Sequence, residues 1–146
     1  MKRQFYIFII SLFLIIFLTG CTGTGVPINS FDKSFAESQV GKVYVLRDFQ
    51  MTGKASVMTI HLNDNLIGEI GEGEIAEGQV QDGKNLLSIS NVYNVPAQLS
   101  FIGNTSKNYY FKTRYLSPIE AISSSSISNI NIKIDRVDSD FQIYDN

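Results

Sequence analysis

From about residue 40 onward, apolar and polar residues alternate over short segments that are separated by turn-forming residues. Many of these segments are rich in β-branched and aromatic side chains, which favour strands, and a period of two places alternate side chains on opposite faces. The pattern predicts an all-β domain, a single small antiparallel β-sandwich of about seven to eight short strands. The predicted strands cover residues 42–48, 56–62, 66–70, 74–80, 85–90, 97–102, 108–116 and 127–134.

Polar and glycine-containing segments predict where the strands end. Turns are expected at residues 63–65, 82–84 and 104–107, which are rich in Asn, Asp, Gly and Ser. Ser117 and Glu120 have the spacing of a capping box, with Pro118 at the first helical position, so one helical turn is expected there.

The chain begins with a different pattern. Lys2 and Arg3 precede residues 5–18, of which 13 of 14 are apolar. As a helix this run would extend roughly 21 Å, which is shorter than the hydrocarbon core of about 30 Å. A positive start, a short apolar run and small residues after it are typical of a secretory signal peptide, here residues 1–20.

The four residues that follow the apolar core, Leu18-Thr19-Gly20-Cys21, resemble the bacterial lipobox at every position. The resemblance implies that a signal peptidase recognises Leu18, Thr19 and Gly20, that cleavage occurs before Cys21, and that the Cys21 thiol carries a diacylglycerol. The two acyl chains of the diacylglycerol, often joined by a third on the new amino terminus, would make the anchoring stable. The alternative is an ordinary signal peptide followed by a chance cysteine. Against it, the chain's single cysteine occupies the one position where lipidation requires a thiol.

Residues 21–39 are rich in Gly, Ser, Thr and Asn and contain Pro27, which predicts a flexible tether between the lipid and a domain at residues 40–146. Phe31 and Phe35 lie four residues apart and would suit a short helix that packs on the domain. Position 22 is Thr rather than Asp, which by resemblance to enterobacterial lipoproteins favours the outer membrane, with the domain facing the periplasm.

Composition narrows the classes of function. The 146 residues hold 12 basic and 14 acidic side chains; without the signal peptide ten basic ones remain, for a formal charge of −4, so no nucleic-acid partner is expected. One cysteine and one histidine exclude a disulfide framework and thiolate or multi-histidine metal sites. We expect no metal, no cofactor and no enzymatic activity.

Four segments together resemble a family of small bacterial lipoproteins named only as a domain of unknown function. The segments are Val43–Arg47, with a Tyr-x-x-Arg pattern, Leu66–Ile70, Asp82–Asn85 and Lys107–Phe111. Asp82 stands where the family has proline, and Asn65 where it often has glycine. The resemblance implies a prealbumin-like or PEGA-like β-sandwich and supplies no catalytic residues.

Two groups of residues are candidates for chemistry. His61 would serve as a general base, but no nucleophile motif accompanies it, so a structural or surface role is favoured. Four glutamates in a glycine-rich segment would suit calcium binding or a glycosidase carboxylate pair. The alternative is a solvated strand edge whose charges discourage edge-to-edge pairing. These glutamates are Glu69, Glu72, Glu74 and Glu77.

Residues 109–116 alternate cleanly, so one face of this strand is expected in the core. The other face carries Tyr110 between Lys112 and Arg114, which suits stacking on a sugar or an anionic polymer, or else cross-strand packing on a solvent face. Arg47 ends the first strand and is expected to bind a partner or, by the commoner use of such an arginine, to pair with a carboxylate at the sheet rim.

The sequence as a whole predicts a lipid-anchored, non-catalytic binding or structural module for another envelope component, either a protein or a glycan. Two alternatives remain: an accessory lipoprotein of a secretion or envelope machine, and an envelope glycan hydrolase that uses the acidic segment.

Overall fold

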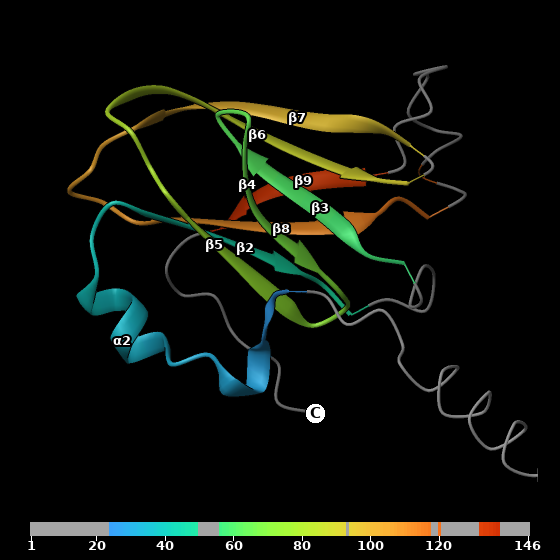
Figure 1. Cartoon of the computed structure of the whole chain (residues 1–146), viewed down its shortest axis with the longest axis horizontal. Coiled ribbons are helices and arrows are strands. Elements are labelled where there is room, and N and C mark those ends of the chain that lie inside the picture. Colours follow the sequence, from blue (N-terminus) through green and yellow to red (C-terminus); the bar gives the residue numbers. More distant parts are fainter. Residues whose placement is uncertain (1–23, 50–55, 93, 118–119, 121–131, 138–146) are drawn as a thin grey trace, which may run out of the picture.

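The computed structural model describes residues 24–49, 56–92, 94–117, 120 and 132–137. Within them, two β-sheets pack face to face, accompanied by one α-helix and one 3-10 helix (Figure 1). The predicted all-β two-sheet fold is confirmed. The strands are β1 (Val26–Pro27), β2 (Lys42–Arg47), β3 (Met58–Leu62), β4 (Asn65–Ile70), β5 (Glu74–Gln79), β6 (Gly83–Asn91), β7 (Asn94–Gly103), β8 (Tyr109–Tyr115) and β9 (Ile132–Val137).

One sheet has the strand order β1-β5-β2-β8-β9 and the other has β4-β3-β6-β7. Consecutive strands β4 and β5 therefore belong to different sheets. The pair β2 and β8 is parallel, with Val43 beside Tyr109, whereas the other pairs are antiparallel. The sandwich is therefore antiparallel, as predicted, except at this pair, where β2 and β8 cross the five-stranded sheet in the same direction.

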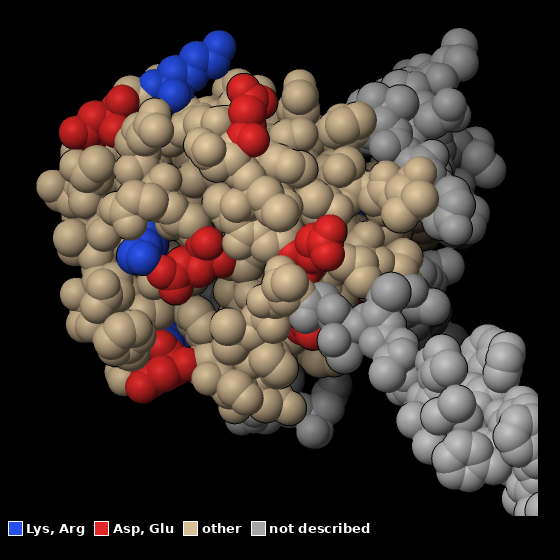
Figure 2. Space-filling model, in the orientation of Figure 1, with Lys and Arg blue, Asp and Glu red and all other residues tan. Residues whose placement is uncertain are grey.

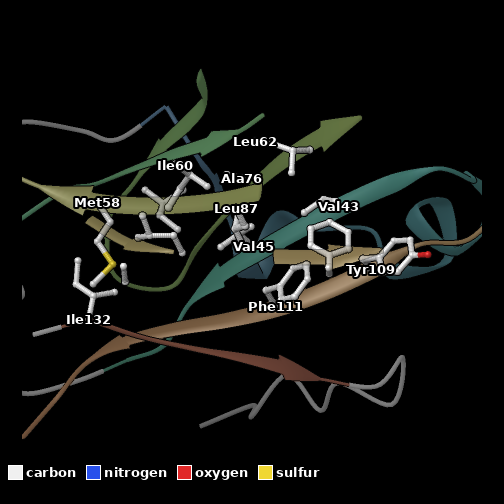
Figure 3. Close-up of a cluster of buried hydrophobic side chains, with 14 of the residues drawn as sticks. Val43, Val45, Met58, Ile60, Leu62, Ala76, Leu87, Tyr109, Phe111 and Ile132 are labelled. Atoms are coloured by element: carbon white, nitrogen blue, oxygen red, sulfur yellow. The ribbon is translucent and has the colours of Figure 1, made fainter. Parts of the chain in front are cut away.

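The main hydrophobic core fills the space between the two sheets (Figure 3). Alternation in β3 buries Met58, Ile60 and Leu62 and leaves His61 on the other face, as the sequence predicts. The same alternation buries every second residue of β8. Fully buried apolar side chains come from both sheets: Val43, Val45 and Phe111 from one, and Met58, Ile60, Ile70, Leu87 and Ile89 from the other.

A tight turn joins β3 to β4 at Asn63 and Asp64, whose φ angles are 50° and 65°. Leu62 pairs with Asn65, so only two residues form the loop, which is the geometry of a type I′ hairpin. Asn and Asp tolerate the left-handed conformation because their short polar side chains bond locally. The turn predicted at residues 63–65 is confirmed, except that Asn65 is the first residue of β4.

Residues 24–39 do not form the predicted flexible tether. They form β1, the 3-10 helix η1 (Ile28–Ser30) and the helix α2 (Lys33–Ser38), which run beneath β5 and β2 in Figure 1. Ile28 and Ala36 are 7% and 2% exposed and form a second small core with residues of β2 and β5. Burial of these apolar side chains outweighs the tether-like composition of the segment.

The predicted helix with Phe31 and Phe35 is confirmed only in part. Asp32 accepts a hydrogen bond from the Phe35 amide at 3.0 Å and so caps α2. Phe35 is 62% exposed, whereas Phe31 packs edge-on against Tyr44 from a position before the helix.

The final strand extends further than predicted. Residues 127–131 lie outside the described part of the chain, and β9 extends to Val137 rather than ending at Ile134.

Candidate functional site

The N-terminal segment crosses from one sheet to the other at the β4–β5 corner. The Glu69 amide of β4 donates to Thr24 Oγ1 at 2.9 Å, and the Gly25 amide donates to the Glu69 carbonyl at 3.0 Å. The next two residues, β1, pair with β5 of the other sheet. A Cβ at Gly25 would lie 2.8 Å from Ile70 Cγ2, so this close approach requires glycine. Thr24 is therefore held in a defined place. We call this end of the sandwich, where Thr24 and Gly25 meet the end of β4 and the start of β5, the entry end.

Two exposed apolar side chains lie at the entry end. Val26 is 48% exposed in β1, and Phe49, just after β2, is 61% exposed. The Phe49 ring lies on the backbone of Gly73, where a Cβ would approach it to 2.3 Å. Gly73 also has a φ of 70°, which favours glycine. The loop before β5 is thus shaped to seat an aromatic ring that stays open to the surroundings.

Arg47 lies behind this surface and is only 2% exposed. Its Nη1 donates to the carbonyls of Ser56 and Ile70, and its guanidinium lies 5.3 Å from the centre of the Tyr115 ring. Burial lowers the pKa of Arg47, while Tyr115, Glu72 and Glu74 raise it. Partner binding, the less favoured of the two roles predicted for Arg47, is wrong for this side chain, because it is buried in the domain.

The Tyr115 hydroxyl connects the two sheets beside Arg47. It lies 2.8 Å from Ser56 Oγ and accepts a hydrogen bond from Asn91 Nδ2 at 2.8 Å. Tyr115 ends β8 in one sheet and Asn91 ends β6 in the other. The polar side chains at the entry end therefore hold the sheets together.

The outer face of β2 and β8 carries an aromatic group. Tyr44 and Tyr110 stack at 5.3 Å between ring centres, with an interplanar angle of 17°. Burial, with a smaller contribution from Glu77, raises the pKa of Tyr44 to about 12. A pocket with room for roughly one water molecule opens here. It is lined by Phe31, Tyr44, Leu46, Ile75, Tyr110 and Phe111.

The two cations that flank Tyr110 have acidic partners within the domain. Lys112 Nζ lies 3.0 Å from Asp48, and Arg114 Nη2 lies 2.6 Å from Glu120. Of the two interpretations of this face, cross-strand packing is confirmed by the Tyr44–Tyr110 stack, although at these tyrosines the face is covered by the second small core rather than open to solvent. The cations are paired rather than arranged around an open ring.

The predicted capping box forms. Ser117 N donates to Glu120 Oε2 at 3.0 Å, and the Glu120 amide donates to Ser117 Oγ at 3.3 Å. The hydrogen bond from Arg114, followed by those from Ser117, holds the pKa of Glu120 well below its usual range.

Acid should therefore weaken the fold through Glu120. Its native pKa is lowered, so its contribution is complete above the ordinary carboxyl pKa of 4.5 and is lost as the pH falls below it. In Glu120→Gln, urea midpoints measured from neutral to acidic pH should fall less steeply than in the unmodified protein. Glu37→Gln, at an exposed site on α2, is the control. Parallel midpoint curves for Glu120→Gln and the unmodified protein would contradict the assignment.

The four glutamates of the acidic segment are distributed rather than gathered. Glu77 pairs with Lys42, and Glu74 Oε2 accepts the Gly71 amide at 2.7 Å. Figure 2 shows acidic side chains separated by uncharged atoms over the visible face. In the part of the chain that the structure describes, no three His, Cys, Asp or Glu side chains are grouped to hold a metal ion. His61 lies half-buried on the outer face of β3.

Two buried or half-buried asparagines have roles that no local pattern indicated. Asn85 is fully buried, and its amide bonds to Gln81, Gly83 and Asn63, which ties the β3–β4 turn to the start of β6. Asn108 Nδ2 donates to the carbonyls of Ala36 and Gln39 and so fixes the end of α2. Both lie in segments that resemble the lipoprotein family, Asp82–Asn85 and Lys107–Phe111. That resemblance is the sequence feature from which their importance could have been predicted.

The predicted lipidation residue Cys21 and the recognition residues Leu18, Thr19 and Gly20 lie outside the described residues. Among the described helices, none is long and apolar enough to cross a membrane.

No family model, curated protein or solved structure matches this chain. The resemblance to the lipoprotein family therefore stays a prediction.

Proposed function

We propose that this chain is a lipid-anchored, non-catalytic β-sandwich module of the bacterial cell envelope that binds or supports another envelope protein or a glycan. The observation that carries the proposal is Leu18-Thr19-Gly20-Cys21, placed directly after a short apolar run and containing the chain's single cysteine. Thr22 favours delivery to the outer membrane, with the domain facing the periplasm.

Two features of the described domain support a non-catalytic role. The aromatic pocket on the outer face of β2 and β8 has room for roughly one water molecule. Every buried side-chain nitrogen and oxygen in the described residues has a hydrogen-bond partner, so the described interior holds no unsatisfied polar group. The polar groups at the entry end join the two sheets instead.

Cys21→Ser tests the anchor. The unmodified protein should partition into the detergent phase and incorporate labelled palmitate, whereas Cys21→Ser should lose the label and leave the detergent phase, because an alcohol cannot form the thioether. Thr22→Ser keeps the thiol and serves as the matched control. Equal partitioning and labelling of the two variants would refute lipid anchoring.

A further inference from the structure

The distance between the proposed anchor and the folded domain is short. Three peptide units separate Cys21 from Thr24, and a fully extended chain of that length spans at most about 11 Å. The flexible tether expected from the sequence would have given a root-mean-square reach of roughly 20–25 Å. A lipid on Cys21 would therefore hold Thr24 at about the depth of the headgroup layer.

Thr24 is also fixed in orientation. Its hydroxyl and the Gly25 amide bond to Glu69 of β4, and Val26 pairs with Ile75 of β5. The Ile28 amide then donates to the Gly73 carbonyl at 2.8 Å. A short link to a point held by both sheets limits rotation of the domain as well as its distance from the lipid.

We propose that the entry end of the sandwich lies directly against the lipid surface, with Val26 and Phe49 in contact with the headgroup region. This inference rests on the proposed anchor at Cys21. Both side chains are exposed, at 48% and 61%. Val26 lies two residues after Thr24, and Phe49 packs on Gly73, whose carbonyl accepts a hydrogen bond from the Ile28 amide of the same N-terminal segment. Apolar and aromatic side chains at an interface gain free energy by partial burial among headgroups.

The charges at the entry end favour one kind of lipid surface. The loop and strand ends beside Thr24 carry Glu69, Glu72 and Glu74; among the described residues nearby, Arg47 is buried and Lys112 is paired with Asp48. Carboxylates close to the membrane repel anionic headgroups within a Debye length of about 8 Å. The entry end therefore suits a zwitterionic surface, such as one rich in phosphatidylethanolamine.

The chain has no tryptophan, so an introduced one is the sole indole fluorophore. Phe49→Trp reports on the entry end. Ile102→Trp is the matched control, because Ile102 is also exposed, at 72%, but lies on β7. Its neighbour Gly103 approaches Val80 and Gln81, beyond the far end of β5, roughly 15–20 Å along that strand from the entry end.

Both full-length lipidated variants would be reconstituted into zwitterionic vesicles that contain phospholipid brominated near the headgroup. Quenching of Phe49→Trp should exceed that of Ile102→Trp at least about two-fold, since an interfacial ring meets the bromine atoms. A Gly/Ser insert of about 15 residues between Thr22 and Gly23 adds roughly 20 Å of reach and should bring the two values together. Replacing half of the zwitterionic lipid with an anionic one should also reduce quenching at Phe49→Trp.

Equal quenching of the two tryptophans without the insert, or quenching of Phe49→Trp that the insert leaves unchanged, would overturn the inference. Vesicle flotation separates this result from failure of the anchor. If unmodified protein floats and Cys21→Ser does not, the anchor stands whatever the quenching shows. If both float equally, the proposed function itself fails. Circular dichroism of each variant verifies folding.

Discussion

Phe111→Ala is expected to lower the free energy of unfolding by about 3–5 kcal/mol. Phe111 is 1% exposed in the middle of β8, beside Val45 on the parallel neighbour β2, and its ring lies 5.1 Å from that of Phe101 in the opposite sheet. Truncation removes apolar contacts with both sheets and leaves a cavity that a sandwich of paired strands closes poorly. The measurement is urea unfolding of the purified protein, followed by circular dichroism.

Phe49→Ala is the control for this prediction. It removes the same ring from a 61% exposed position, so in detergent solution the loss should stay below about 1 kcal/mol. Similar losses for the two variants would show that Phe111 does not occupy the centre of the core.

Arg47→Leu should destabilise the protein by about 3–5 kcal/mol although leucine keeps much of the apolar volume. The carbonyls of Ser56 and Ile70 would lose their donor, and Glu72 and Glu74 would lose a nearby positive charge. Buried acceptors without partners carry their full desolvation cost. Urea midpoints at neutral pH measure the effect.

Arg114→Leu is the control for Arg47→Leu, because it also removes an arginine charge but from a partly exposed position. Arg114 pairs with Glu120, but its side chain is 24% exposed and the Glu120 side chain 41%, so water compensates part of the loss. A decrease of about 1 kcal/mol or less is expected. Equal effects at the two arginines would mean that Arg47 contributes no more than a surface ion pair.

Local alternation was sufficient to place most strands and their buried faces. Met58, Ile60 and Leu62 face the core, as does the Tyr109 face of β8, because a period of two fixes which side chains share a side. The β3–β4 turn and the Ser117–Glu120 capping box were also predictable, since each depends on residues within a few positions of one another.

The candidate site was much less predictable. Arg47 was expected at a rim and is buried, because the carbonyls that accept its hydrogen bonds belong to Ser56 and Ile70, which are distant in sequence. No local pattern predicted the position of Phe49, since the Gly73 loop on which its ring lies comes from another part of the chain.

The sequence by itself determined the strand positions, the inward faces and the four residues that resemble a lipobox, because each is encoded within a few consecutive positions. Only the tertiary structure decided that β2 and β8 run parallel and that residues 24–39 pack on the domain rather than link it loosely to residue 21. Those outcomes depend on contacts between distant segments, such as Thr24 with Glu69 and Ala36 with Asn108, whose energies no local pattern records.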